Sequence, residues 1–155
     1  FAPLADAWSP AENVVHLIKS VSPVAKAMRL HKFLLLTLFG TSKKPSRRFI
    51  QIKEDYRREL GKGVKATGRY IPILKEMPSD FEQAQRDLLQ KWDDVGNRLL
   101  VVLSEWNEDS LDKLRLPHPV LGKLTVREMI FFTLYHNLHH VNNVRKRRGQ
   151  EVIAV

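Results

Sequence analysis

The sequence contains no cysteine, which excludes disulfide bonds and every metal site that is built on thiolates. It also has no apolar run near the roughly 20 residues that a membrane-spanning helix needs. The longest such run is FLLLTLF at residues 33–39. The N-terminus lacks the basic, apolar and small-residue order of a secretory signal. We therefore expect a cytoplasmic protein without a membrane segment.

The composition that remains is that of an ordinary globular domain, with 155 residues, 43% hydrophobic and 28% charged. This length fits one domain, which we place at residues 1–155. The chain begins at Phe1 rather than Met, and a helix start follows as early as Ser9. We therefore expect a further segment upstream of this sequence.

Positive charge is in excess, because 26 Lys and Arg residues stand against 17 acidic residues and leave a net charge of +9. The excess is concentrated in KKPSRR (43–48), YRREL (56–60) and RKRR (145–148). Such charge favours association with phosphate polymers or anionic lipid, although a solvated face is the simpler interpretation. The chain shows no helix-turn-helix signature, zinc-finger spacing or aromatic-basic interleaving. A non-enzymatic basic bundle that binds nucleic acid is thus an alternative, but not the favoured one.

Three segments begin with the pattern of a capping box, in which a Ser or Thr and a Glu three residues later bind free backbone N–H groups. They are SPAE (9–12), SDFE (79–82) and TVRE (125–128). The first predicts a helix over residues 10–20 that Pro23 kinks or restarts and that extends to Phe39.

The other two boxes open long helices. The second leads into one apolar stripe with spacings of three and four, made of Phe81, Ala84, Leu88, Trp92, Val95, Leu99, Val102 and Trp106. The third leads into residues 126–149, where basic residues and Gly149 mark the end. Residues 49–60 form a short helix within a crossover rich in glycine and proline. Because no strand of convincing length appears, we expect an all-α fold of the four-helix-bundle type with one long crossover.

Three of the six histidines lie within YHNLHH, at residues 135–140. At 100° per residue, His136 and His140 are neighbours one turn apart on the stripe of Met129, whereas His139 lies about 80° away. An i, i+4 histidine pair on an inward helix face presents two imidazoles to one divalent ion. From spacing alone, a packed or solvated pair is the equal alternative.

A third ligand has to come from elsewhere in the chain. His16 is the best candidate, because Glu12 and Ser20 make its face of the first helix polar. His31 lies among bulky apolar residues and His118 lies between two prolines in an expected loop, so both are less promising.

The motif WSPAENVVHLIK (8–19), followed by HPVLGKLTVREMIFFTLYHNLHHVNNVRK (118–146), resembles the DinB-like/YfiT-like family of metalloenzymes. The resemblance covers nearly the whole chain, with both motifs in the expected order around a variable middle. It implies a four-helix bundle in which a further helix precedes the Trp-led motif, and that helix is missing from this sequence or lies upstream of it. It also implies that His16, His136 and His140 bind a divalent metal.

Members of this family are often dimeric, and we expect a homodimer here. Phe131 and Tyr135 lie opposite the histidine face and need a partner helix or subunit. Three neutral imidazoles leave an ion its full charge and an open position, which favours an anionic ligand. Ligand type does not choose between zinc, nickel, iron and manganese.

Some members of the family are transferases or isomerases that use a low-molecular-weight thiol. The resemblance thus implies a metal-dependent S-transferase or isomerase, with hydrolysis as a close variant and a purely structural metal as the alternative. Glu12, one turn before His16, is our candidate for a proton acceptor or a partner of that ligand. Asn143, where many relatives have Gln, is a candidate for a substrate-facing amide.

Overall fold

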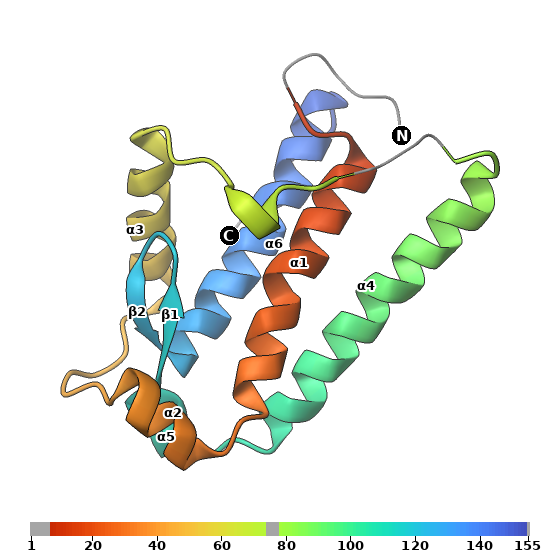
Figure 1. Ribbon diagram of the computed structural model, residues 1–155. Coiled ribbons are helices and arrows are strands. Elements are labelled where there is room, and N and C mark those ends of the chain that lie inside the picture. Colours follow the sequence, from red (N-terminus) through yellow and green to blue (C-terminus); the bar gives the residue numbers. More distant parts are fainter. Residues whose placement is uncertain (1–6, 74–77, 155) are drawn as a thin grey trace.

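The computed structural model describes residues 7–73 and 78–154. Its longer helices are α1 (Pro10–Met28), α3 (Phe49–Gly61), α4 (Phe81–Ser104) and α6 (Val126–Arg147). The shorter elements are α2 (Lys32–Phe39), η1 (Gly68–Tyr70), α5 (Glu108–Lys113), β1 (Arg115–His118) and β2 (Gly122–Thr125). Helix α1 packs against both α4 and α6, and α3 packs against α6 (Figure 1). The predicted helical-bundle class is confirmed.

Two of the three predicted capping boxes form. Ser9 Oγ accepts the N–H of Glu12 at 3.2 Å, and the Glu12 carboxylate accepts the N–H of Ser9 at 2.7 Å. Thr125 and Glu128 make the same reciprocal pair at the start of α6. Each box binds backbone N–H groups that have no partner within the first helical turn, so it sets where α1 and α6 begin.

The box predicted at Ser79 is wrong. Helix α4 begins at Phe81, and its N-cap is Asp80, whose carboxylate accepts the N–H of Gln83 at 2.9 Å. An aspartate one position later offers the same local acceptor and adds a negative charge at the positive end of the helix dipole.

Pro23 lies inside α1, which continues past it to Met28. A new helix, α2, begins after His31, whose Nδ1 accepts the N–H of Phe33 at 3.3 Å. The single helix that was expected to reach Phe39 is therefore two helices. Pro23 removes only one backbone donor, whereas the chain leaves the helical conformation between Met28 and α2.

The second half of the predicted apolar stripe faces the bundle, where Val95 and Val102 of α4 are buried. Phe81 at its start is 45% exposed. Trp106 lies beyond the end of α4 at Ser104 and donates its indole N–H to the carbonyl of Met28 at 3.1 Å. The outer face of the same helix is open to solvent, with Leu100 65% exposed.

A short antiparallel hairpin, β1–β2, was not predicted from the sequence, and neither were the short helices α5 and η1. His118 shapes its turn, because its Nδ1 accepts the N–H groups of Val120 at 3.2 Å and Leu121 at 2.9 Å. Gly122 follows with a φ of +73°, which favours glycine. Strands of four residues show too few alternations to stand out in a sequence. His118 consequently ends a strand and does not lie in an irregular loop.

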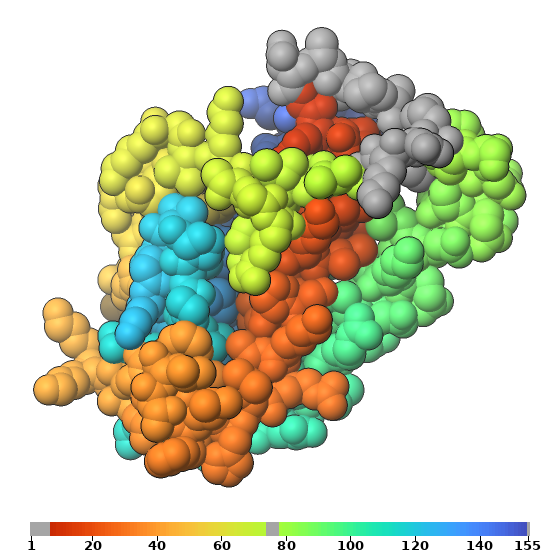
Figure 2. Space-filling model, in the orientation of Figure 1, coloured from red at the N-terminus to blue at the C-terminus, as the bar shows by residue number. Residues whose placement is uncertain are grey.

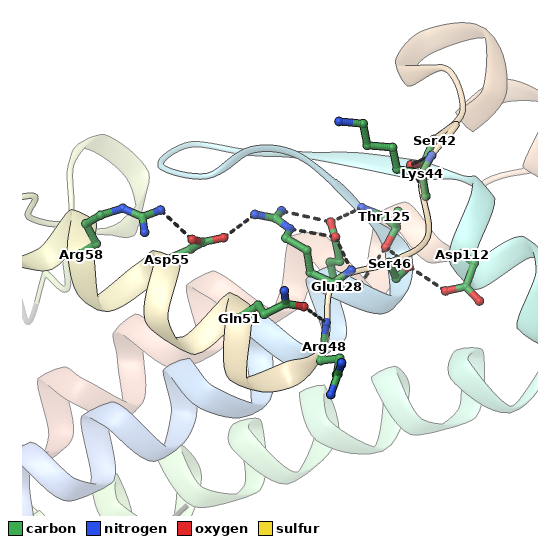
Figure 3. Close-up of polar contacts among 11 residues, drawn as sticks. Ser42, Lys44, Ser46, Arg48, Gln51, Asp55, Arg58, Asp112, Thr125 and Glu128 are labelled. Atoms are coloured by element: carbon green, nitrogen blue, oxygen red, sulfur yellow. Dashed lines mark hydrogen bonds and ion pairs between the residues drawn. The ribbon is translucent and has the colours of Figure 1, made fainter.

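An ion-pair network fastens the start of α3 to α6 (Figure 3). Glu128 accepts the Arg47 Nε–H at 2.9 Å and the Arg47 backbone N–H at 2.8 Å, and Arg47 also binds Asp55 at 2.5 Å. Burial raises the pKa of Glu128, but the hydrogen bonds from Arg47 and Thr125 outweigh burial and leave that pKa below its usual value.

Phe131 and Tyr135 of α6, which were expected to need a partner helix or subunit, pack against α3. The ring of Phe49 lies 6.1 Å from that of Phe131 and 6.4 Å from that of Tyr135, centroid to centroid. The core that α2, α3, the hairpin and α6 share includes the fully buried Leu35, Ile52, Leu116, Leu124 and Val126. Among the described residues, no helix combines the length and apolar character that crossing a bilayer requires.

Candidate metal centre

Three buried imidazoles meet between α1 and α6. The Nε2 atom of His136 lies 3.2 Å from that of His16 and 3.2 Å from that of His140, and the three candidate ligand atoms lie within 4.8 Å of one another. Three nitrogens at about 2.1 Å from one ion stand about 3.4 Å apart in a tetrahedron and about 3.0 Å apart on an octahedral face. The two distances to His136 Nε2 fall between these two geometries.

Hydrogen bonds set the tautomer of His16. Its Nδ1 lies 2.7 Å from the carbonyl oxygen of Tyr70 in η1, which can only accept. The proton of this ring is therefore on Nδ1, and the Nε2 lone pair is directed toward His136.

His140 is held in the same way by Asn13, whose Oδ1 lies 2.6 Å from its Nδ1. The orientation of the Asn13 amide is fixed independently, because its Nδ2 donates to the carbonyls of Trp8 at 3.1 Å and Ser9 at 2.8 Å. The amide oxygen must then face His140, and this ring also carries its proton on Nδ1. An acceptor at Nδ1, as His16 and His140 have, is the usual support of a metal-ligating histidine.

Burial keeps these rings neutral. It lowers the pKa of His136 to about 2, assisted by repulsion from His140 and His16, and it lowers the pKa of His140 to about 3. Burial also lowers the pKa of His16, against the opposing hydrogen bond to Tyr70. If His136 carries its proton on Nε2, it can donate a hydrogen bond to His16 or to His140, but not to both. A cation can bind the Nε2 lone pairs of all three rings at once. The donor set thus fits a divalent ion.

The three imidazoles open into a cavity of about 350 Å³. One face of α1 and one face of α6 form two of its walls, and α3, the hairpin, η1, the end of α2 and the segment 64–67 also line it. In Figure 2 the segment that holds η1 lies over α1 and beside the hairpin, with atoms of α6 visible between them. A three-ligand group with an adjoining cavity is the arrangement of catalytic zinc sites, whereas structural sites are closed.

Two further histidines line this cavity. The ring of His118 packs on Phe132 with centroids 4.1 Å apart, and burial lowers the pKa of His118 to about 4. His139 accepts a hydrogen bond from Asn143 Nδ2 at 3.0 Å, and burial lowers its pKa as well. His31, in contrast, is an exposed N-cap of α2.

Two predicted residues lie beside the site but outside the cavity lining of the described chain. The carboxylate of Glu12 closes the capping box with the N–H of Ser9, and the amide of Asn143 is bound to His139. Their roles as proton acceptor and substrate-facing amide stay predictions.

Three residues with a direct part in the site were not found in the sequence. Asn13 could have been noticed, because it lies three positions before His16 and so on the same helix face. The carbonyl of Tyr70 carries no sequence signal. Tyr56 of α3 lines the cavity with its ring centroid 5.8 Å from that of His136, and burial raises the pKa of its phenol to about 12.

Comparison with known proteins gives two matches. The sequence profile of the DinB superfamily matches residues 1–144. The chain is 26% identical over 147 residues to the uncharacterized protein YuaE of Bacillus subtilis (strain 168), and the alignment covers 93% of this chain and 79% of YuaE. No solved structure matches the chain significantly.

Proposed function

This chain belongs to the DinB superfamily, and from that premise we propose that it is a divalent-metal-dependent enzyme. The favoured reaction is a thiol-dependent S-transfer or isomerisation, and hydrolysis is the close variant. The observation that carries the proposal is the convergence of the His16, His136 and His140 Nε2 atoms beside an open cavity. Zinc, nickel, iron and manganese are the candidate ions.

A divalent ion on three neutral imidazoles keeps its positive charge and supplies Lewis-acid activation of a thiol or of water. The chain contributes the surroundings of that centre. Asn13 and Tyr70 hold two of the rings in the ligating tautomer. The phenol of Tyr56 keeps its proton at neutral pH, because its pKa is about 12, and so it is available as a hydrogen-bond donor to an anion in the cavity.

We place this activity in the cytoplasm, where low-molecular-weight thiols are kept reduced. We further propose a homodimer, because large apolar side chains lie exposed on α4 and on α6, the two helices that pack against α1. Leu100 and Val101 of α4 are 65% and 63% exposed, and Leu134 of α6 is 56% exposed. Exposed apolar patches of this kind favour contact with another protein surface.

The nucleic-acid alternative rests on the basic runs, and three arginines of these runs make intramolecular contacts. Arg47 is bound to Glu128 and Asp55. Arg145 donates to the carbonyl of Glu151, and Arg147 donates to the carbonyl of Trp8. A purely structural metal is the other alternative, and the cavity beside the imidazoles argues against it.

Elemental analysis of the purified, untagged protein tests the metal site. We expect about one ion per chain in the wild type after reconstitution, and its loss in His16→Ala and in His136→Ala/His140→Ala. His31→Ala is the matched control, since this exposed imidazole lies outside the site, and it should keep the ion. An equal metal content in all four proteins, or none in the reconstituted wild type, would overturn the metal centre.

A turnover screen then tests the reaction. Metal-loaded protein is incubated with a small thiol, such as cysteine or glutathione, and an electrophile whose conjugation is followed by absorbance. Rates above the uncatalysed reaction that vanish in His136→Ala/His140→Ala support the transferase. A loaded protein that is inert with thiols but hydrolyses activated esters would favour the hydrolytic variant. Loaded protein without turnover, and with a melting temperature raised by the ion, would favour the structural metal.

A further inference from the structure

The cavity beside the three imidazoles is elongated along α1. The lining residues His16, Ser20, Val24 and Ala27 recur at spacings of three and four, so they form one stripe of this helix. From His16 to Ala27 the helix rises by about 16 Å. Beyond Ser20 the stripe is apolar, and the far part of the lining includes Leu30, Phe39 and Leu116. The cavity therefore has a polar end at the imidazoles and an apolar wall that leads away from it.

The charged side chains that line the cavity are all positive. Within the described chain, none of the residues around the cavity is Asp or Glu, and the charged residues are Lys65 and Arg69. Both are exposed, so they stand at the mouth. Arg69 also lies over the ring of Tyr70, 5.1 Å from its centroid, and the Tyr70 carbonyl holds His16. Arg69 is thereby placed at the imidazole end of the cavity.

We infer that this cavity takes an amphipathic acid, with its anionic group at the end where the imidazoles and Arg69 lie and an extended apolar body along α1 toward α2. Neutral imidazoles and an acid-free wall offer a cationic ligand no counter-charge, whereas Lys65 and Arg69 offer one to an anion. Each methylene of the ligand that is buried against the apolar wall makes the binding free energy more favourable. This substrate class belongs to the proposed function and depends on it only for the presence of the ion. Lys65, Arg69 and the apolar wall are present without any ion.

Isothermal titration with three probes of equal chain length tests this directly: octanoate, octanol and octylammonium. Each is titrated below its micelle concentration into zinc-loaded and into metal-free protein, and metal content is measured on the same samples. We expect octanoate to bind at least tenfold more tightly than the other two probes to the loaded protein. From butanoate to decanoate, affinity should rise roughly threefold to fourfold per methylene.

Matched variants locate the binding. Lys65→Gln/Arg69→Gln should weaken octanoate at least fivefold without changing octanol, while Lys43→Gln/Arg57→Gln removes the same two charges outside the cavity lining and should change neither. Ala66→Trp should block both octanoate and octanol, because residue 66 lines the cavity. Gln85→Trp, on the exposed face of α4 and outside the lining, is the control for a new indole.

The results separate this inference from the proposed function. If no ion binds but octanoate keeps its preference over octylammonium, the metal enzyme fails and the acid site stands. If zinc binds and octylammonium binds as well as octanoate, or if chain length has no effect, the acid site is overturned and the metal centre stands. Equal weakening by the Lys65/Arg69 and Lys43/Arg57 variants would also overturn it, since general surface charge would then explain the preference.

Discussion

His140 Nδ1 lies 2.6 Å from Asn13 Oδ1, although 127 positions separate the two residues in the sequence. This contact joins α1 to α6 and orients one of three imidazoles at the same time. Because the amide of Asn13 is itself anchored to the carbonyls of Trp8 and Ser9, the ring of His140 is held by a fixed acceptor.

Asn13→Ala should therefore weaken zinc binding by roughly 10- to 100-fold, the usual effect of removing the hydrogen-bond partner of a metal-ligating histidine. Competition with a chromogenic chelator measures it. Asn142→Ala, which removes an exposed amide of α6 that binds the backbone of Ile153, should leave zinc affinity unchanged. Equal affinities in both variants would show that Asn13 does not support the ligand.

Tyr56→Phe should lower turnover about tenfold or more while metal content and melting temperature stay close to the wild type. The variant removes one hydroxyl from the cavity and keeps the ring packing against Phe132. Tyr135→Phe is the matched control, because Tyr135 is also buried with a raised pKa but does not line the cavity. If the two variants lose the same activity, the Tyr56 hydroxyl has no special role.

The metal-free protein should lose stability as the pH falls below about 6.5, the ordinary pKa of histidine. The folded-state pKa values of His136 and His140 are about 2 and about 3, so the folded protein leaves these rings neutral while the unfolded chain binds protons. Between pH 6.5 and its folded-state pKa, each ring therefore lowers the free energy of unfolding by about 1.4 kcal/mol for every unit that the pH falls.

Urea unfolding of metal-free protein at a series of pH values between 7 and 4 measures this slope. His136→Phe should reduce it by about one proton, whereas His31→Ala should not change it. A flat profile over this range would mean that the buried rings are already protonated in the folded state.

Glu128→Gln should lower the free energy of unfolding by about 2 kcal/mol, because a neutral amide cannot replace the carboxylate that binds Arg47 and the N–H of Thr125. The side chain of Glu128 is 7% exposed, so solvent cannot compensate for the loss. Glu82→Gln, at the start of α4 with a side chain that is 87% exposed, should change stability by no more than about 0.5 kcal/mol. Urea unfolding at pH 7 compares the two; equal losses would contradict the buried role of Glu128.

Interactions between residues that are close in the sequence determine where several helices begin. The capping boxes at Ser9 and Thr125 set the starts of α1 and α6 because their hydrogen bonds span three residues. The same locality explains the error at Ser79, since two adjacent residues could both cap α4 and Asp80 does. The hairpin escaped prediction because strands of four residues hold too little periodic signal.

By itself, the sequence determined that His136 and His140 lie one turn apart on one face of a helix, because helical periodicity is a property of neighbouring residues. Only the tertiary structure decided that His16 meets them, that Asn13 and Tyr70 set the tautomers, and that a cavity opens beside all three. Those relationships depend on how α1, η1 and α6 pack, and packing depends on the whole core at once. Local propensity can place a side chain on a helix face, but the partner across the bundle is chosen by the fold.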